Sequence, residues 1–139
     1  MIKDVAEWQK YVKVPDLAGK CSEGWEEALE AKSRIDQEKY LTMVVMGTGI
    51  FEQLHMLMTF EDTLMNFLLE PEAMHELIDV ICEYRLTYMK LVVENLHPDC
   101  IVSHDDWGQK TACSCRRRYG ESSLRSLTES FMIISIHRE

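Results

Sequence analysis

The sequence has no apolar run long enough to cross a membrane, no paired CxxC motif, and only three Pro and six Gly in 139 residues. The missing run argues against a membrane span, and the first ten residues contain neither an apolar signal core nor a small-residue cleavage site. The five Cys stand at unpaired spacings, which predicts reduced thiols, three of them in a core, and not a disulfide framework. We therefore expect a cytoplasmic protein.

Positive charge is scarce as well. The chain has 15 Lys and Arg against 24 Asp and Glu, a net charge of -9, and no amphipathic segment carries a basic stripe. Such a chain repels a nucleic-acid backbone and an anionic membrane, so we expect neither as a partner. With 46% hydrophobic and 28% charged residues, the composition is that of a globular domain with its own core.

Apolar spacing predicts two strands separated by helices. Residues 40–46, YLTMVVM, form a short unbroken apolar run, as expected of a strand covered on both faces. Residues 100–105 predict a second strand that runs from apolar to charged. A stripe over 71–96 predicts a long helix that begins at Pro71 and is interrupted by Arg85, which we expect to pair with a carboxylate or to reach outward. Shorter helices are predicted at 5–12, 24–35, 50–58 and 64–68.

The order strand, helices, strand predicts an α/β fold with parallel neighbouring strands and helices that cover the sheet. Two strands cannot make such a domain alone, because unpaired sheet edges and uncovered apolar faces would remain. We therefore expect the isolated chain to self-associate through exposed sheet edges, to bind a partner, or to stay incompletely folded.

Charged residues follow the second strand. His104, Asp105 and Asp106 lie at the carboxyl end of a predicted parallel strand, where the loops of α/β proteins converge on a ligand. Two carboxylates that leave an apolar strand are costly to bury without partners, so a pocket is one destination. The alternative, given equal weight, is that one Asp caps the following helix and the other is solvated.

The first strand ends in a glycine-containing turn. Gly47 and Gly49 could let the backbone and a helix N-terminus approach a ligand, although turn geometry explains them equally well. Glu52 and His55 are three residues apart and share a helix face, which could support proton transfer or a metal. A histidine that is exposed or satisfied by its neighbours is the more common outcome of such a pair.

In this order, GTGIFEQLH at 47–55, PEAMHELID at 71–79 and HDDWG at 104–108 resemble the uroporphyrinogen decarboxylase superfamily. That superfamily includes decarboxylases of heme biosynthesis and corrinoid-linked methyltransferases, all built on (β/α)8 barrels. The resemblance covers roughly residues 1–110 and implies a partial TIM barrel. It also implies a small-molecule substrate, either a tetrapyrrole carboxylate or a methyl donor.

The resemblance implies site residues by position. His55 matches an active-site tyrosine of the decarboxylases and Asp105 matches a serine that meets substrate, which makes these two the catalytic candidates. Gly47, Gly49, His104 and Asp106 are the corresponding substrate-binding candidates. Neither the tyrosine nor the serine is preserved, and these two departures favour the methyltransferase branch somewhat. The decarboxylase reading requires no cofactor, whereas the methyltransferase reading implies zinc and a corrinoid partner.

Several catalytic groups of the superfamily have no counterpart in this chain. The decarboxylases use an arginine pair and an aspartate in an amino-terminal segment and a histidine far downstream, and the methyltransferases place their zinc-binding His and Cys downstream. No metal ligand is therefore assigned here, and the chain is expected to be an inactive internal fragment. A non-catalytic remnant or a subunit completed by another chain is the third interpretation.

The amino-acid composition of the chain changes after residue 110. Residues 111–139 contain five Arg, no Lys, three acids and six Ser, whereas residues 1–110 contain ten basic residues, 21 acids and three Ser. Cys113 and Cys115 with His104 could suggest zinc, and Arg116–Arg118 an anion patch, but we favour neither. We expect little ordered structure in this tail.

A shifted reading frame that begins near Thr111 is our hypothesis for the tail. Permitted codons for residues 111–137, read from the third base of the Thr111 codon, can encode SLFMSPEVWREFFKKPYRKLYDYIH, which resembles the superfamily's continuation after DDWG. Synonymous codons leave freedom, yet some positions are tightly limited: Tyr119 followed by Gly120 can yield only Trp or Arg. The gene's DNA around codon 111 tests the hypothesis.

Overall fold

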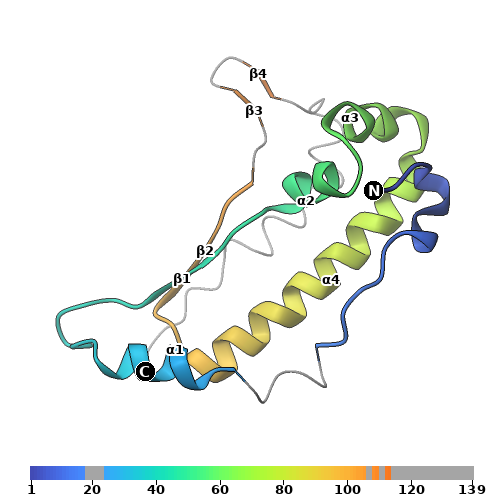
Figure 1. Ribbon diagram of the computed structural model, residues 1–139. Coiled ribbons are helices and arrows are strands. Elements are labelled where there is room, and N and C mark those ends of the chain that lie inside the picture. Colours follow the sequence, from blue (N-terminus) through green and yellow to red (C-terminus); the bar gives the residue numbers. More distant parts are fainter. Residues whose placement is uncertain (18–23, 106–107, 110–111, 114–139) are drawn as a thin grey trace.

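The computed structural model describes residues 1–17, 24–105, 108–109 and 112–113 (Figure 1). The elements in chain order are the 3₁₀ helix η1 (Val5–Lys10), helix α1 (Glu26–Ser33), strand β1 (Met43–Met46), helices α2 (Ile50–Leu57), α3 (Phe60–Leu69) and α4 (Pro71–Leu96), and strands β2 (Cys100–Ser103), β3 (Gly108–Gln109) and β4 (Ala112–Cys113). Asp106 and residues 114–139 lie outside the described residues, and so do the predictions made for them. No helix in the described ranges is long and apolar enough to cross a membrane.

Strands β1 and β2 pair in parallel, with Met43 opposite Cys100 and Met46 opposite Ser103. The predicted α/β arrangement, with parallel strands joined through helices, is thereby confirmed. Within the described ranges this sheet contains two strands, so barrel closure stays a prediction. Both strands are shorter than predicted, because β1 starts at residue 43 and β2 ends at residue 103.

Polar contacts fix the amino ends of the two strands. The carboxylate of Asp99 accepts hydrogen bonds from the backbone N–H and the hydroxyl of Thr42, both at 2.7 Å. In return the carbonyl of Thr42 accepts from the N–H groups of Asp99 and Cys100 at 2.9 and 3.2 Å. A shift of one residue would reverse the faces of the strand and break these contacts, so the register is well specified.

Among the residues that the structure describes, elements cover only one face of the parallel sheet. Helix α4 runs along that side in Figure 1. Met46, at the end of β1, is buried. On the opposite face, the side chains of Met43 and Val45 are 57% and 59% exposed. The strand is therefore not covered on both faces as the apolar run predicts, whereas the expectation that the isolated chain leaves an apolar face uncovered agrees with these exposures. The run hides the alternation of burial, since nearly all of its side chains are hydrophobic on both sides.

The core lies where η1, α2 and α3 pack on α4. Phe51 and Leu54 of α2 and Leu77 and Ile78 of α4 are almost completely buried there, together with Trp8 of η1. These α2 and α4 residues follow helical spacing, which explains why burial of one face stabilises both helices. The long helix has the bounds that the sequence predicts.

Two smaller elements differ from expectation. Helix α1 buries none of its residues, and Lys32 at its end donates to the carbonyls of Leu96 and His97 at 2.7 and 2.8 Å, which satisfies carbonyl groups at the carboxyl end of α4. The helix predicted at 24–35 is therefore present but shorter, and it contributes no side chain to the core. Strands β3 and β4 form a short antiparallel pair that the sequence did not predict.

Candidate functional site

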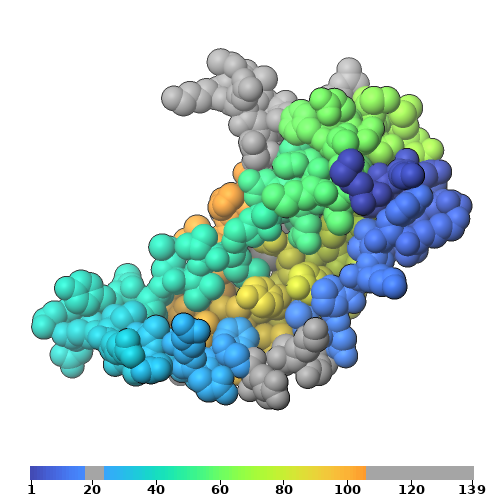
Figure 2. Space-filling view, in the orientation of Figure 1, coloured from blue at the N-terminus to red at the C-terminus, as the bar shows by residue number. Residues whose placement is uncertain are grey.

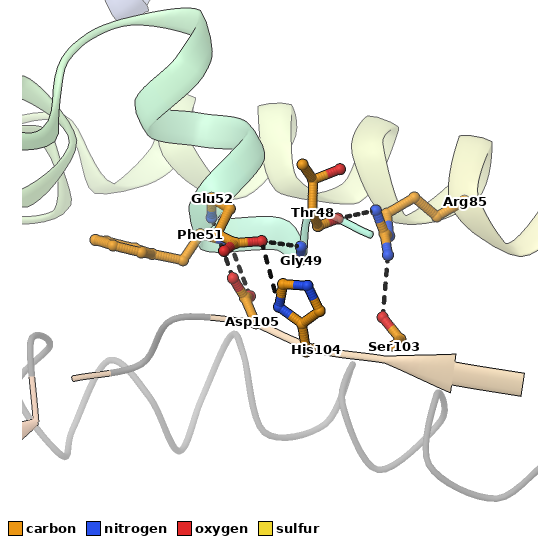
Figure 3. A network of polar contacts seen from close by, with 8 residues as sticks. All are labelled: Thr48, Gly49, Phe51, Glu52, Arg85, Ser103, His104 and Asp105. Carbon is orange, nitrogen blue, oxygen red and sulfur yellow. Dashed lines mark hydrogen bonds and ion pairs between the residues drawn. The ribbon is translucent and has the colours of Figure 1, made fainter. Parts of the chain in front are cut away.

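The carboxyl ends of β1 and β2 lie side by side, because the register places Met46 opposite Ser103. The loops that follow them meet beside the first turn of α2, and Figure 3 shows their polar groups converging there. This is the end of a parallel sheet at which α/β proteins place ligand-binding and catalytic groups. The structure thus brings three of the predicted site residues, Gly49, His104 and Asp105, into one cluster.

Asp105 holds the amino end of α2. Its two carboxylate oxygens accept hydrogen bonds from the backbone N–H of Phe51 at 2.9 Å and of Glu52 at 3.1 Å. A carboxylate is well placed here, because the first N–H groups of a helix have no partner within the helix and the helix dipole favours negative charge. The sequence left open that one of the two aspartates caps the following helix. Asp105 is indeed a capping residue, but it caps α2, which lies about fifty residues earlier in the chain.

Gly49 allows Asp105 to approach. It is buried, and a Cβ atom at this position would lie closer than 3.0 Å to Asp105, a separation that Cβ atoms in proteins essentially never show. Its N–H donates to Oε2 of Glu52 at 3.0 Å, so the side chain of Glu52 turns back on the start of its own helix. Gly47 differs: it is exposed, and a Cβ there would meet nothing within 4 Å.

Arg85 of α4 bridges the carboxyl ends of the two strands (Figure 3). It is 6% exposed, and its guanidinium donates to the carbonyl of Thr48 and, at 3.1 Å, to the hydroxyl of Ser103. Thr48 has a φ of 52°, a left-handed conformation that is rare for a β-branched residue, and its carbonyl is held by Arg85. Of the two alternatives predicted for Arg85, pairing with a carboxylate or reaching outward, the second is wrong, because Arg85 is buried with the apolar stripe of α4.

Burial and the neighbouring charges shift the pKa of Arg85 in opposite directions. Burial lowers the pKa of the Arg85 guanidinium, while the negative charge of Asp105, followed by Cys82 and Glu52, raises it. A buried guanidinium keeps its charge only where such acceptors and anions surround it. Arg85 therefore balances the negative charge that Asp105 and Glu52 bring to the strand ends.

His104 and His55 have different surroundings. Nδ1 of His104 lies 3.7 Å from Oε2 of Glu52, and the His104 side chain is 60% exposed while that of Glu52 is 20% exposed. The ring of His55 lies 5.7 Å from that of Phe51 and 6.2 Å from that of Phe60. The structure thus pairs Glu52 with His104 and not with His55. His55 lies in an aromatic cluster, which fits the more common case of a histidine that is satisfied by its neighbours.

The cluster has the parts that proton transfer requires. An exposed imidazole lies beside a partly buried carboxylate, and a fixed positive charge stands behind them. In the described part of the chain, no group of three or more His, Cys, Asp or Glu is placed to hold a metal ion. These residues therefore do not fit the zinc that a methyltransferase reading implies.

Three comparisons of the chain, with protein-family models, with curated proteins and with solved structures, gave no match. The resemblance to the uroporphyrinogen decarboxylase superfamily therefore rests on the residues of this sequence and stays a proposal.

Sequence reasoning missed the central position of Arg85 and the contributions of Thr48 and Ser103. One signal was present for Arg85: a cation in an otherwise apolar helical stripe must be buried with acceptors or break the stripe. No comparable signal marks Thr48 or Ser103, since polar residues at strand ends are common.

Proposed function

We propose that this chain is part of a (β/α)8 barrel of the uroporphyrinogen decarboxylase superfamily, whose intact form removes carboxylate groups from uroporphyrinogen in heme biosynthesis. The observation that carries the proposal is the convergence of GTG and HDD, two segments of the resemblance, at the carboxyl ends of paired parallel strands. The two segments are more than fifty residues apart, and a functional pocket at strand ends requires them to meet.

Decarboxylation replaces a carboxylate by hydrogen. The bond between the substrate carbon and the carboxylate carbon breaks, carbon dioxide leaves, and a proton is added to the substrate carbon. His104 is the described residue best placed to carry that proton, because its ring is exposed and Glu52 can orient it. Asp105 acts as a positioning residue in this proposal, since both of its oxygens are engaged by the start of α2.

The arrangement also explains why we expect low catalytic activity from this chain. Arg85 is the buried cation of the cluster, and it is engaged by Thr48, Ser103 and nearby anions. Binding several substrate carboxylates requires further cations, which the superfamily supplies from regions without a counterpart here. We therefore expect the 139-residue chain to have little or no activity by itself.

The experiment compares this chain with a protein made from the gene together with the coding sequence on both sides of it, after a one-base change near codon 111 restores the superfamily-like continuation. Release of carbon dioxide from uroporphyrinogen by the restored protein, and its loss in His104→Ala, would support the proposal. Lys90→Ala, at an exposed position of α4, is the matched control. Absence of any one-base change that yields the continuation would remove the frame hypothesis.

Corrinoid-dependent methyl transfer is the second candidate, and the residues at positions 55 and 105 favour it, because they differ from the decarboxylase groups. Methyl transfer from a methylated corrinoid protein to a thiol, measured on the same two proteins, separates the candidates. Zinc ligands for that reaction would have to come from outside the described residues. Activity in neither assay would favour a non-catalytic remnant or subunit.

A further inference from the structure

One peptide unit after β1 is held from both sides. The carbonyl of Thr48 accepts a hydrogen bond from the guanidinium of Arg85, and the N–H of Gly49 donates to Oε2 of Glu52 at 3.0 Å. This carbonyl and this N–H belong to the same planar trans peptide, so they point in opposite directions. Arg85 and Glu52 therefore hold the Thr48–Gly49 peptide from opposite sides and fix its orientation together (Figure 3).

The conformation of this peptide requires such support. Thr48 has a φ of 52°, a region that is unfavourable for a β-branched residue and persists only where the surroundings hold it. The chain from β1 to α2 lies against α4 in the space-filling view (Figure 2), and Arg85 is 6% exposed. The support on the carbonyl side is therefore a charged group that the packing of α4 keeps in place.

The charge of Arg85 also acts along the peptide. A cation on the carbonyl polarises the whole peptide group, which makes its N–H a stronger donor. The acceptor of that N–H is Oε2 of Glu52, and the same oxygen lies 3.7 Å from Nδ1 of His104. One carboxylate oxygen thus links the held peptide to an exposed imidazole. The path runs from a buried cation to a ring that is 60% exposed.

Arg85 has a second route to His104. It also donates to the hydroxyl of Ser103 at 3.1 Å, and Ser103 precedes His104 in the chain. This route fixes the backbone at the end of β2 but not the direction of the imidazole, since a side chain rotates about its own χ angles. The carboxylate of Glu52 faces the ring, so the first route determines that Nδ1 points toward Glu52 and Nε2 away from it.

We propose that Arg85 is a positioning residue for His104, and that it acts through the Thr48–Gly49 peptide and Glu52. This inference rests on the proposed function, in which His104 carries the proton. Nε2 is then the atom that gives the proton, because Nδ1 faces the carboxylate. Arg85 is buried behind the peptide, so its replacement should lower kcat and leave KM nearly unchanged.

Nuclear magnetic resonance of the 139-residue chain tests the path without any activity. In Arg85→Met the Gly49 amide should exchange with solvent at least about tenfold faster, and the ring nitrogen shifts of His104 should move toward those of Glu52→Ala. Arg85→Lys, which keeps a charged donor, should recover part of both changes. With Glu52→Ala already in place, Arg85→Met should leave the His104 ring unchanged, because the path is already broken. Arg85→Gln replaces Arg85→Met should that variant fail to fold.

Ser103→Ala is the matched control for this measurement, because it removes one acceptor of Arg85 and leaves the contact with Thr48. Exchange of the Gly49 amide should then stay within about threefold of the wild type. The amide of Leu77, in the core of α4, reports global unfolding and separates it from a local effect. Equal acceleration by Ser103→Ala and Arg85→Met, or a His104 ring that does not respond to Arg85→Met, would overturn the inference.

The protein with the restored continuation gives the kinetic test. Arg85→Met should lower kcat for carbon dioxide release at least about tenfold with KM within about twofold, and Arg85→Lys should recover part of the loss. A raised KM with unchanged kcat would assign Arg85 to substrate binding and overturn the inference. A restored protein that releases no carbon dioxide would contradict the proposed function alone, because the Gly49 and His104 measurements still decide whether the path exists.

Discussion

Gly49 and Asp105 approach so closely that a Cβ atom on Gly49 would overlap the carboxyl group of Asp105. The contact joins the end of β1 to the segment after β2, and it lets the carboxylate of Asp105 reach the N–H groups of Phe51 and Glu52. The backbone of Gly49 is extended, with a φ of -68°, so the requirement for glycine comes from space and not from backbone conformation.

Gly49→Ala should therefore displace Asp105 from the amino end of α2. We expect a loss of about 2 kcal/mol in the free energy of unfolding, from the displaced cap and the local overpacking. Urea unfolding followed by circular dichroism measures the loss, and amide hydrogen exchange at Phe51 and Glu52 should become faster.

Gly47→Ala is the matched control for this substitution, because a Cβ at residue 47 meets nothing within 4 Å. We expect a change within about 0.5 kcal/mol, typical of surface sites. With Asp105→Gly already in place, which removes both the carboxyl group and the Cβ atom that Gly49→Ala would meet, Gly49→Ala should cost clearly less than it does alone. An equal cost in both backgrounds would contradict the assigned contact.

Asp105→Asn should weaken the start of α2 without removing the side chain. The amide keeps one oxygen that can accept, but it loses the second acceptor and the negative charge that favours a helix N-terminus. We expect about 1 kcal/mol of lost stability. Asp36→Asn, which removes an exposed pair with Lys39, should change stability little. Equal effects of the two substitutions would speak against the cap.

The carboxyl-end location of the site could be predicted from sequence, but its internal contacts could not. Apolar strands followed by GTG and HDD indicate where polar groups gather in a parallel α/β fold. Which atoms meet depends on distances between residues far apart in the chain, such as Asp105 and Phe51, separated by 54 positions. Local spacing had suggested Glu52 with His55, whereas the structure pairs Glu52 with a histidine from the other loop.

Helix α4 shows the opposite case. Pro71 suits a first-turn position, and the i, i+3, i+4 stripe continues to Leu96, so both bounds were predicted from local signals. Burial of the strands was less predictable, since YLTMVVM is apolar at nearly every position and the pattern cannot reveal which side a helix covers. Whether a face of β1 is exposed depends on which elements pack beside the strand, and the composition of the strand does not encode this.

Arg85→Met should be strongly destabilising although it introduces an apolar residue of similar length. The carbonyl of Thr48 and the hydroxyl of Ser103 would lose their donor, and the nearby carboxylate of Asp105 would lose a compensating charge. We expect a loss of about 3 kcal/mol, as for one partner removed from a buried charged network. Urea unfolding measures this, and Lys90→Met on the exposed side of α4 should stay within about 0.5 kcal/mol.

Cys82 of α4 should make stability fall at alkaline pH. Burial, and secondarily the charge of Asp79, raises the pKa of the Cys82 thiol from 9.0 to about 11, while Arg85 lowers it. Above pH 9 the thiol ionises in the unfolded chain but stays protonated in the folded one. The unfolded state then binds fewer protons, so the free energy of unfolding decreases with rising pH.

The decrease attributable to Cys82 should reach about 2 kcal/mol between pH 9 and pH 11, because each pKa unit corresponds to about 1.4 kcal/mol. Urea unfolding of the wild type and of Cys82→Ala across this range isolates the effect, since all other groups titrate in both. Because the variant lacks the buried sulfur, it will be less stable than the wild type below pH 9. Above pH 9 its free energy of unfolding should decrease less steeply with pH. Cys100→Ala, at a half-buried position in β2, provides the comparison. Identical slopes for the wild type and Cys82→Ala would show that the thiol ionises equally well in the folded protein, which would contradict the burial of Cys82 in the core cluster.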